Sequence, residues 1–250
     1  MKRHDHKDLF SAQSGLYAAF RPTYPMDLYE FIFQHLHEKK EAWDCATGNG
    51  QVATSLADHF EKVFATDISQ QQLKLAKPKH NIFYTLSPAE QTPFQDNQFD
   101  LTTVGQALHW FDRNRFFEEV KRVSKPDGLL AVWGYALMRI EPAIDRIITD
   151  FYNNTIGPYW DEARKLVEEE YRTIEFPFEE IQSPAFAIQV GWTVDQLSGY
   201  LSSWSATQKY ISTNGLNPVL ALMANIGKHW KTKQLKTISF PVFLRLFRIC

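Results

Sequence analysis

Residues 42–51, "AWDCATGNGQ", decide the fold class of this chain. The first residues are apolar enough for a buried strand, and a turn with two glycines follows them. When a strand runs directly into a helix, the first N–H groups of the helix have no partner within it, and glycine lets ligand atoms approach that backbone closely. The stretch therefore predicts a strand, a turn that binds a nucleotide-type cofactor, and a helix.

Apolar runs typical of strands alternate with segments of helical periodicity through the first half of the chain. Apolar residues recur at helical spacing after Pro25, after Gly50 and after Asp112, and we expect Ser69 and Asp112 to cap helices. Strands that alternate with helices predict a parallel sheet covered on both faces. The strand-like runs are "AWDCA", "KVFATD", "NIFYTL", "FDLTTVG" and "LLAVWGY".

The pattern changes after residue 138. Between Met138 and Ser183, "PAIDRIITDFYNNTIGPYW" and "DEARKLVEEEYRTI" both predict helices, which we interpret as an insertion rather than a new domain. "FAIQV" can return to the sheet, a capping box beginning at Thr193 precedes a helix, and another helix opens near Pro218. The tail "TISFPVFLRLFRI" alternates like a strand, and Pro241 predicts that regular pairing begins after it.

Composition limits the function classes. The chain has 250 residues, 44% hydrophobic residues and a formal net charge of -2, which is ordinary for one globular domain and gives no general field for nucleic acid or anionic membranes. The only cysteines, Cys45 and Cys250, cannot provide a disulfide framework. No apolar run is long enough to span a bilayer, and the polar start lacks a signal-peptide core. We expect a cytoplasmic protein, a monomer or homodimer, that acts on a small molecule.

The glycine turn alone does not identify the cofactor. "GNGQVA" also fits the dinucleotide pattern G-x-G-x-x-G/A, and Asp67 lies 19 residues after Gly48, as the ribose partner of NAD would. Asp44, four residues before Gly48, favours another cofactor, because a pyrophosphate site has no use for that acid. Its carboxylate can accept from the ammonium group of a cofactor, directly or through water, or can simply brace the loop.

These motifs resemble those of the class I S-adenosylmethionine-dependent methyltransferases, with Ala46 where the family usually has glycine. The resemblance implies that Asp67, in "ATDIS", holds the ribose hydroxyls and that Ile68 flanks the adenine. "SPAEQTPF" is similar to the segment along the adenine edge, and "DNQFDLTTVGQALHWFD" to the fourth-strand motif. The cofactor-binding residues implied in this way are Asp44, Ala46, Gly48, Gly50, Asp67, Ile68, Glu90, Gln106 and His109.

A narrower resemblance covers nearly the whole chain. "YAAFRPTYP", "QALHWFD" and "GYLSSWSATQKY" look like the methyltransferases of the type 11 kind related to trans-aconitate methyltransferase, which O-methylate a small carboxylic acid. Arg21 is the best candidate to bind a carboxylate through its bidentate fork, with Tyr17 and Tyr24 nearby as lid residues, or it is a surface arginine packed on aromatic residues. That carboxylate belongs either to the cofactor or to the substrate. The resemblance favours the cofactor, and it then implies that Tyr17 also binds the cofactor.

The resemblance also implies an architecture. We expect a Rossmann-like α/β fold with a seven-stranded, mostly parallel sheet, helices on both faces, a helical cap, and an antiparallel last strand. The whole chain, 1–250, then forms one methyltransferase domain. Its parts are N-terminal lid helices (1–40), a cofactor-binding core (41–137), a helical insertion (138–183), and C-terminal strands with cap helices (184–250).

The residues near the expected acceptor site suggest chemistry without a strong base. Methyl transfer needs alignment and exclusion of water, and a carboxylate acceptor is already ionised at neutral pH. His109 can act as a base if its pKa stays near 6.5, or it can be structural. Trp110, Trp192, Trp204 and Tyr24 can border the substrate pocket. No histidine spacing predicts a metal site.

Two alternatives for the function remain, a nicotinamide-dependent NAD(P) oxidoreductase and a cofactor-binding protein without catalysis.

Overall fold

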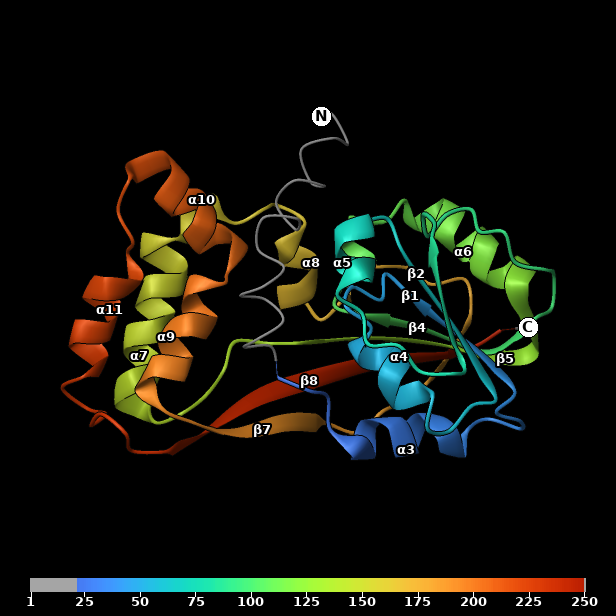
Figure 1. Cartoon of the computed structure of the whole chain (residues 1–250), viewed down its shortest axis with the longest axis horizontal. Coiled ribbons are helices and arrows are strands. Elements are labelled where there is room, and N and C mark those ends of the chain that lie inside the picture. Colours follow the sequence, from blue (N-terminus) through green and yellow to red (C-terminus); the bar gives the residue numbers. More distant parts are fainter. Residues whose placement is uncertain (1–21, 250) are drawn as a thin grey trace.

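The computed structural model describes residues 22–249. Five parallel strands form one half of its sheet in the order β3-β2-β1-β4-β5 (Figure 1). Asp44, one residue before the end of β1, pairs with Ala65 of β2 on one side and with Thr103 of β4 on the other. The glycine turn therefore follows the central strand of the parallel half. The strands are β1 (Glu41–Cys45), β2 (Lys62–Asp67), β3 (Ile82–Leu86), β4 (Phe99–Gly105) and β5 (Ser124–Tyr135).

Three antiparallel strands complete the sheet. β8 (Lys236–Arg248) pairs antiparallel with β5, and both β7 (Phe186–Trp192) and β6 (Glu179–Ile181) pair antiparallel with β8. The antiparallel last strand and the return of "FAIQV" to the sheet are confirmed. The described residues form eight strands rather than seven, because β6 lies in a segment expected to be helical. An ion pair between Arg245 and Glu180 ties β6 to β8.

The expectation for Pro241 was wrong, because β8 begins five residues before it. Pro241 pairs with Ala187 of β7, and its carbonyl accepts from the N–H of Ala136 just after the end of β5. In a strand, the N–H and C=O groups of one residue point toward the same neighbouring strand. The carbonyl of Pro241 points toward β5, so an N–H at this position would also point toward β5, just beyond its last residue. The proline therefore removes no bond from the β7 ladder.

Helices cover both faces of the parallel half. One buried cluster joins α3 (Met26–Gln34) and α4 (Gln51–Leu56) to alternate residues of the strands, such as Ala131 of β5. A second joins α6 (Arg113–Val123) to the opposite set, such as Val132. α5 (Gln70–Lys74) follows β2. The Asp112, Ser69 and Thr193 caps predicted from the sequence are all present.

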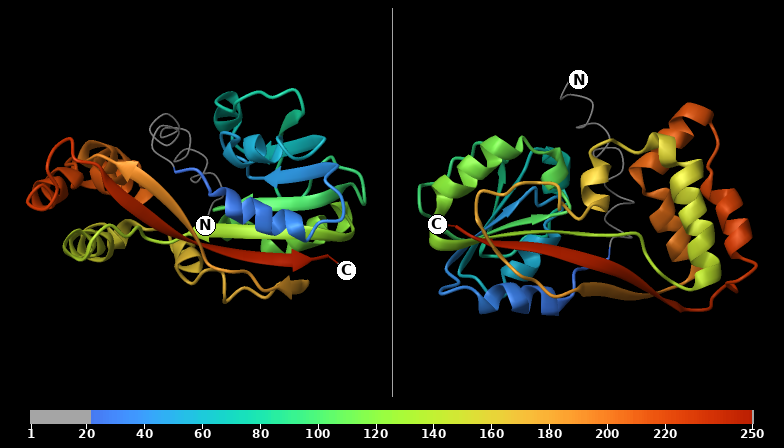
Figure 2. Two further views of the ribbon diagram at one scale, coloured as in Figure 1. Left: turned by 90° about the horizontal axis from the view of Figure 1, so that it is seen from below. Right: turned by 180° about the vertical axis from the view of Figure 1, so that it is seen from behind.

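A helical cap gathers at the far end of β7 and β8, away from the parallel strands (Figure 2). Among the cap elements, the short helix α8 lies nearest the parallel sheet (Figure 1). No helix within residues 22–249 is long and apolar enough to cross a membrane. The cap elements are α7 (Pro142–Asp150), the π-turn η2 (Phe151–Thr155), η3 (Gly157–Tyr159), α8 (Arg164–Glu168), α9 (Val194–Ser202), α10 (Ser205–Asn214) and α11 (Val219–Ile226).

The helix predicted over "DEARKLVEEEYRTI" is much shorter than expected. Only Arg164–Glu168 is helical, and Glu170 and Tyr171 have φ of 54° and 56°, in the left-handed region that ends a helix. Tyr171 is fully buried, and its carbonyl accepts from Arg245 at 2.7 Å. Tertiary contacts of this one tyrosine therefore override the local helical pattern.

Candidate active site

The glycine turn has the conformation that its sequence requires. Ala46, Gly48 and Gly50 all have positive φ, at 54°, 58° and 79°. A Cβ atom at Gly50 would collide with the end of the Tyr84 side chain unless that side chain moved, so the positive φ and this contact both disfavour other residues here. α4 begins at Gln51, as the strand, turn and helix prediction required. The usual glycine at position 46 avoids a backbone strain that Ala46 accepts here.

Asp44 braces this turn from beneath. Its side chain is 1% exposed and accepts hydrogen bonds from Thr47 Oγ1 at 2.5 Å, from the Ala53 N–H at 3.0 Å and from Thr103 Oγ1 at 2.9 Å. Burial raises the pKa of Asp44 to about 6, against the opposing effect of these hydrogen bonds. Of the two roles that the sequence left open for this acid, the contacts describe the bracing one.

Asp67 closes the turn from the end of β2. One carboxylate oxygen accepts from the Gly48 N–H at 2.8 Å, and the other from the Ser69 N–H at 2.7 Å. Burial raises the pKa of Asp67, and these two hydrogen bonds oppose the rise. The carboxylate is only partly buried, and an ionised carboxylate has about four acceptor positions, so it can accept further donors from a ligand. Ile68 beside it is an exposed apolar residue.

Gln106, at the end of β4, presents an unused donor. Its Oε1 accepts from the Tyr135 N–H at 2.9 Å, which fixes the orientation of the amide. Its Nε2 is buried and has no hydrogen-bond partner in the described part of the chain. Gly134 makes this arrangement possible, because a Cβ there would lie 2.6 Å from Gln106 Oε1. A buried donor without a partner indicates a place where a ligand acceptor fits.

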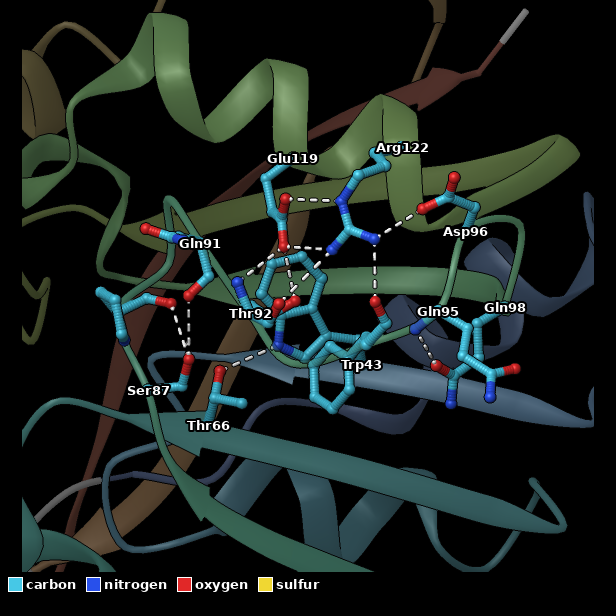
Figure 3. Close-up of polar contacts among 12 residues, drawn as sticks. Trp43, Thr66, Ser87, Gln91, Thr92, Gln95, Asp96, Gln98, Glu119 and Arg122 are labelled. Atoms are coloured by element: carbon cyan, nitrogen blue, oxygen red, sulfur yellow. Dashed lines mark hydrogen bonds and ion pairs between the residues drawn. The ribbon is translucent and has the colours of Figure 1, made fainter.

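A network of charged side chains anchors the loop that carries Ala89 and Glu90 (Figure 3). Glu119 of α6 accepts from the N–H and the hydroxyl of Thr92 at 2.7 and 2.6 Å, and it pairs with Arg122 at 2.7 Å. Arg122 also donates to the Phe94 carbonyl at 2.8 Å. Glu90 itself accepts from the Asp112 N–H at 2.9 Å. α6 therefore fixes the position of the predicted adenine-edge segment.

His109 lies just after β4, in surroundings that do not suit the role of general base that the sequence left open. It is buried, and its Nδ1 lies 3.0 Å from Tyr171 Oη. Burial, and then the positive charge of Arg164, lower the pKa of His109 to about 3. This pKa lies well below the value near 6.5 on which a role as base depends, and it favours the structural role that the sequence also left open. Trp110 has a ring centroid 4.6 Å from that of His109 and is 37% exposed.

The other aromatic residues proposed for the substrate pocket lie in packed clusters. Tyr24 packs edge-on against Trp133, with ring centroids 5.5 Å apart. Trp192 packs on Phe240, and Trp204 packs against the rings of two cap residues, Tyr152 and Trp160. Their role at the acceptor remains a prediction. Tyr17 and Arg21 lie outside the described residues.

The sequence interpretation missed Arg164 and Tyr171. The fold brings them from the insertion to the edge of the parallel sheet, where α8 contacts η1 (Leu108–Trp110) and Tyr171 meets His109. No local pattern marks either residue, since both lie in what reads as one continuous helix. Within residues 22–249, no group of three or more potential metal ligands occurs.

The candidate site therefore lies at the ends of β1, β2 and β4. Asp44 and Asp67 both contact the glycine turn, and Gln106 follows the neighbouring strand β4. In an open parallel sheet, ligands bind outside the carboxyl ends of the strands, beside the point where the strand order reverses. Here the order reverses between β1 and β4.

Comparison with known proteins agrees with this geometry. A sequence profile described as a methyltransferase domain matches residues 43–132. A protein of Dictyostelium discoideum provisionally assigned as a methyltransferase is 34% identical over 247 residues, 96% of this chain and 94% of its own length. An uncharacterised methyltransferase-like protein of Schizosaccharomyces pombe is 25% identical and covers 80% of this chain and 78% of its own.

A solved structure shows the same fold over nearly the whole length. It is a provisionally assigned type II methyltransferase from Anaeromyxobacter dehalogenans, with a TM-score of 0.87, 32% identity, and coverage of 92% of this chain and 99% of its own. The match includes the cap as well as the parallel sheet. The fold, the glycine turn and the full-length relatives lead to one conclusion: this chain belongs to the methyltransferase family.

Proposed function

We propose that the protein is an S-adenosylmethionine-dependent methyltransferase that O-methylates a small carboxylic acid. The family supports methyl transfer. The cofactor follows from the fit of the site, and the acceptor class from the state of His109. The narrower similarity to trans-aconitate methyltransferase relatives, stated from the sequence, remains a prediction.

The residues around the glycine turn fit S-adenosylmethionine. Asp67 has free acceptor positions for ribose hydroxyls, and exposed Ile68 offers an apolar surface for adenine. The orphaned Nε2 of Gln106 is a donor for a carboxylate or carbonyl oxygen of the cofactor. When bound, the cofactor supplies an activated methyl group on a sulfonium. The protein's part is to orient the acceptor and exclude water.

His109 carries the argument for a carboxylate acceptor. A neutral imidazole with a pKa near 3 is a poor base at neutral pH, so it does not favour proton removal from a hydroxyl. Burial also raises the pKa of its partner Tyr171 well above the ordinary tyrosine value, so this phenol stays protonated. A carboxylate is already ionised and needs only orientation. The pair His109 and Tyr171 therefore serves as a wall and hydrogen-bonding support.

Two measurements test this proposal. Calorimetry should show binding of S-adenosylmethionine, and Asp67→Ala should weaken it by about 1.5 to 3 kcal/mol because the ribose hydroxyls lose a charged acceptor. Mass spectrometry should show the gain of one methyl group on members of a panel of small carboxylic acids, but not on the matching primary amides. Unchanged affinity in Asp67→Ala would refute the assigned ribose contact.

The pH dependence separates acid from hydroxyl acceptors. A carboxylate acceptor gives a flat rate between about pH 6 and 8, and His109→Gln should keep that flat profile. A rate that falls below about pH 6.5 in the wild type, and loses this fall in His109→Gln, would favour a hydroxyl acceptor with His109 as its base. Cofactor binding without turnover on any acceptor would favour the non-catalytic alternative.

A further inference from the structure

A cavity of about 610 Å³ lies in the cap next to α8, and nothing described so far accounts for it. Its lining includes the aromatic rings of Tyr152 and Trp160. The charged side chains in the lining are those of Arg164, Lys165, Asp161, Glu162 and Glu168. α8 forms one wall and contacts η1, the short helix that carries His109. Figures 1 and 2 both show α8 between the other cap helices and the edge where the strands end. α8 therefore lines the cavity and also touches the short helix that carries His109.

Two aromatic residues hold the Arg164 guanidinium in the wall of this cavity. Its Nε donates to Tyr152 Oη at 3.2 Å, and its Cζ lies 5.0 Å from the centre of the Trp160 ring. Tyr152 in turn donates to Glu168. These contacts use one nitrogen and one face of the guanidinium, which fixes its plane and leaves the two terminal nitrogens available.

Those terminal nitrogens have no acceptor in the described part of the chain. No carboxylate among residues 22–249 comes within 4.0 Å of Arg164, although Glu168 lies one helical turn away. The carboxylate of Glu168 accepts from Tyr152 instead. An arginine that is oriented by neighbours but not paired is prepared for a planar anion, because its parallel N–H groups match a carboxylate.

The charge of Arg164 acts on the active-site edge. After burial, Arg164 is the next cause of the lowered pKa of His109, and it also opposes the raised pKa of Tyr171. The contact of α8 with η1 and the hydrogen bond between His109 and Tyr171 also bring these elements together. The cavity, the oriented guanidinium and the loop after β4 are thus neighbours in space, although they come from distant parts of the sequence.

We propose that Arg164 binds the carboxylate of the acceptor, with the apolar body of the acid against Tyr152 and Trp160. This inference rests on the proposed function and names its acceptor subsite. When both carboxylate oxygens accept from the terminal nitrogens, each keeps a further lone pair, so one of them can still take the methyl group. The rings of Tyr152 and Trp160 favour acids with an aromatic or aliphatic body.

Equilibrium binding tests the subsite without relying on turnover. Phenylacetate and its neutral partner phenylacetamide are titrated by calorimetry into the wild type, Arg164→Met, Arg164→Lys and the control Arg146→Met. Arg146 is an exposed residue of α7, so its variant removes a cap charge outside the cavity. We expect the wild type to prefer phenylacetate at least tenfold, Arg164→Met to lose this preference, and Arg164→Lys to keep part of it. Arg146→Met should match the wild type.

Kinetics with the acid that the wild type methylates best gives a second readout. Arg164→Met should raise KM for the acid by about 10- to 100-fold and leave the affinity for S-adenosylmethionine unchanged. Absence of phenylacetate binding to the wild type, or equal binding by a folded Arg164→Met, overturns the Arg164 assignment whatever the methyl-transfer assay shows. Absence of methyl transfer and of cofactor binding in the wild type instead overturns the proposed function. Thermal unfolding confirms that each variant is folded.

Discussion

Single residues in the glycine turn differ in the backbone strain that they carry. Ala46 accepts a left-handed conformation that is unfavourable by about 1 to 2 kcal/mol for an L-residue, whereas Gly50 has no such strain. Ala46→Gly removes this strain, but it also makes the unfolded chain more flexible, which opposes the gain. We therefore expect the free energy of unfolding to rise by up to about 1 kcal/mol. Gly50→Ala should lower it by about 1 to 3 kcal/mol. Urea unfolding followed by tryptophan fluorescence measures both.

Gly191→Ala is the matched control for these variants. Gly191 is exposed in β7 and has no heavy atom within 4 Å of an added Cβ, so its replacement should change stability by less than about 0.5 kcal/mol. If Gly50→Ala proves as harmless as Gly191→Ala, the left-handed turn and its close contact with Tyr84 do not constrain this position.

Asp44 gives a pH dependence whose sign follows from its raised pKa. An acid with a pKa of about 6 when folded and near 3.8 when unfolded binds its proton more tightly in the folded state. Its contribution to stability is therefore favourable at low pH and is lost as the pH rises through about 4 to 6. The unfolding free energy of the wild type minus that of Asp44→Asn should be about 2 kcal/mol larger at pH 4 than at pH 7. A constant difference across this range would contradict the buried carboxylate.

At the scale of elements, the network around Arg122 joins α6 to the loop over residues 87–98. Burial raises the pKa of Glu119, but hydrogen bonds from Arg122 and Thr92 outweigh it and lower the pKa, so the glutamate stays ionised and paired. Glu119→Gln should lower stability by about 1 to 3 kcal/mol and speed amide exchange in that loop. Hydrogen exchange measured by mass spectrometry reports the loop directly.

Glu118→Gln provides the control for this network. Glu118 is the neighbouring residue of α6 but is exposed to solvent, so its variant changes the same charge at the same helix without touching the loop. Faster exchange of the loop in both variants, or in neither, would show that Glu119 and Arg122 do not hold it.

At the scale of the whole molecule, β8 connects the cap to the parallel sheet (Figure 2). Phe240, fully buried at the middle of this strand, packs against Tyr135 of β5 and against Trp192 and Tyr200 of the cap side. Phe240→Ala should cost about 3 to 5 kcal/mol and lower one common calorimetric transition. A separate transition for the cap would contradict a shared core, and Phe83→Ala, at an exposed edge position, should cost much less.

Much of the fold was determined by local sequence. The turn after β1, the caps at Ser69, Asp112 and Thr193, and the alternation of β8 depend on contacts within a few residues, and all of them are present. Propensity, capping and periodicity act over that range, so they can be read without knowing the fold. The meeting of the glycine turn with Asp67 also follows from the parallel order of neighbouring strands.

Only the tertiary structure decided the rest. β6 forms because β8 offers an unpaired edge, and the helix around Arg164 ends because Tyr171 is buried against His109 and Arg245. The pKa of His109 depends on burial and on Arg164, which lies 55 residues away in sequence. Pairing, burial and charge at such separations depend on which surfaces meet in three dimensions. The sequence by itself therefore determined the glycine turn, whereas the fold alone brought Tyr171 and the helix that carries Arg164 to His109 and its short helix.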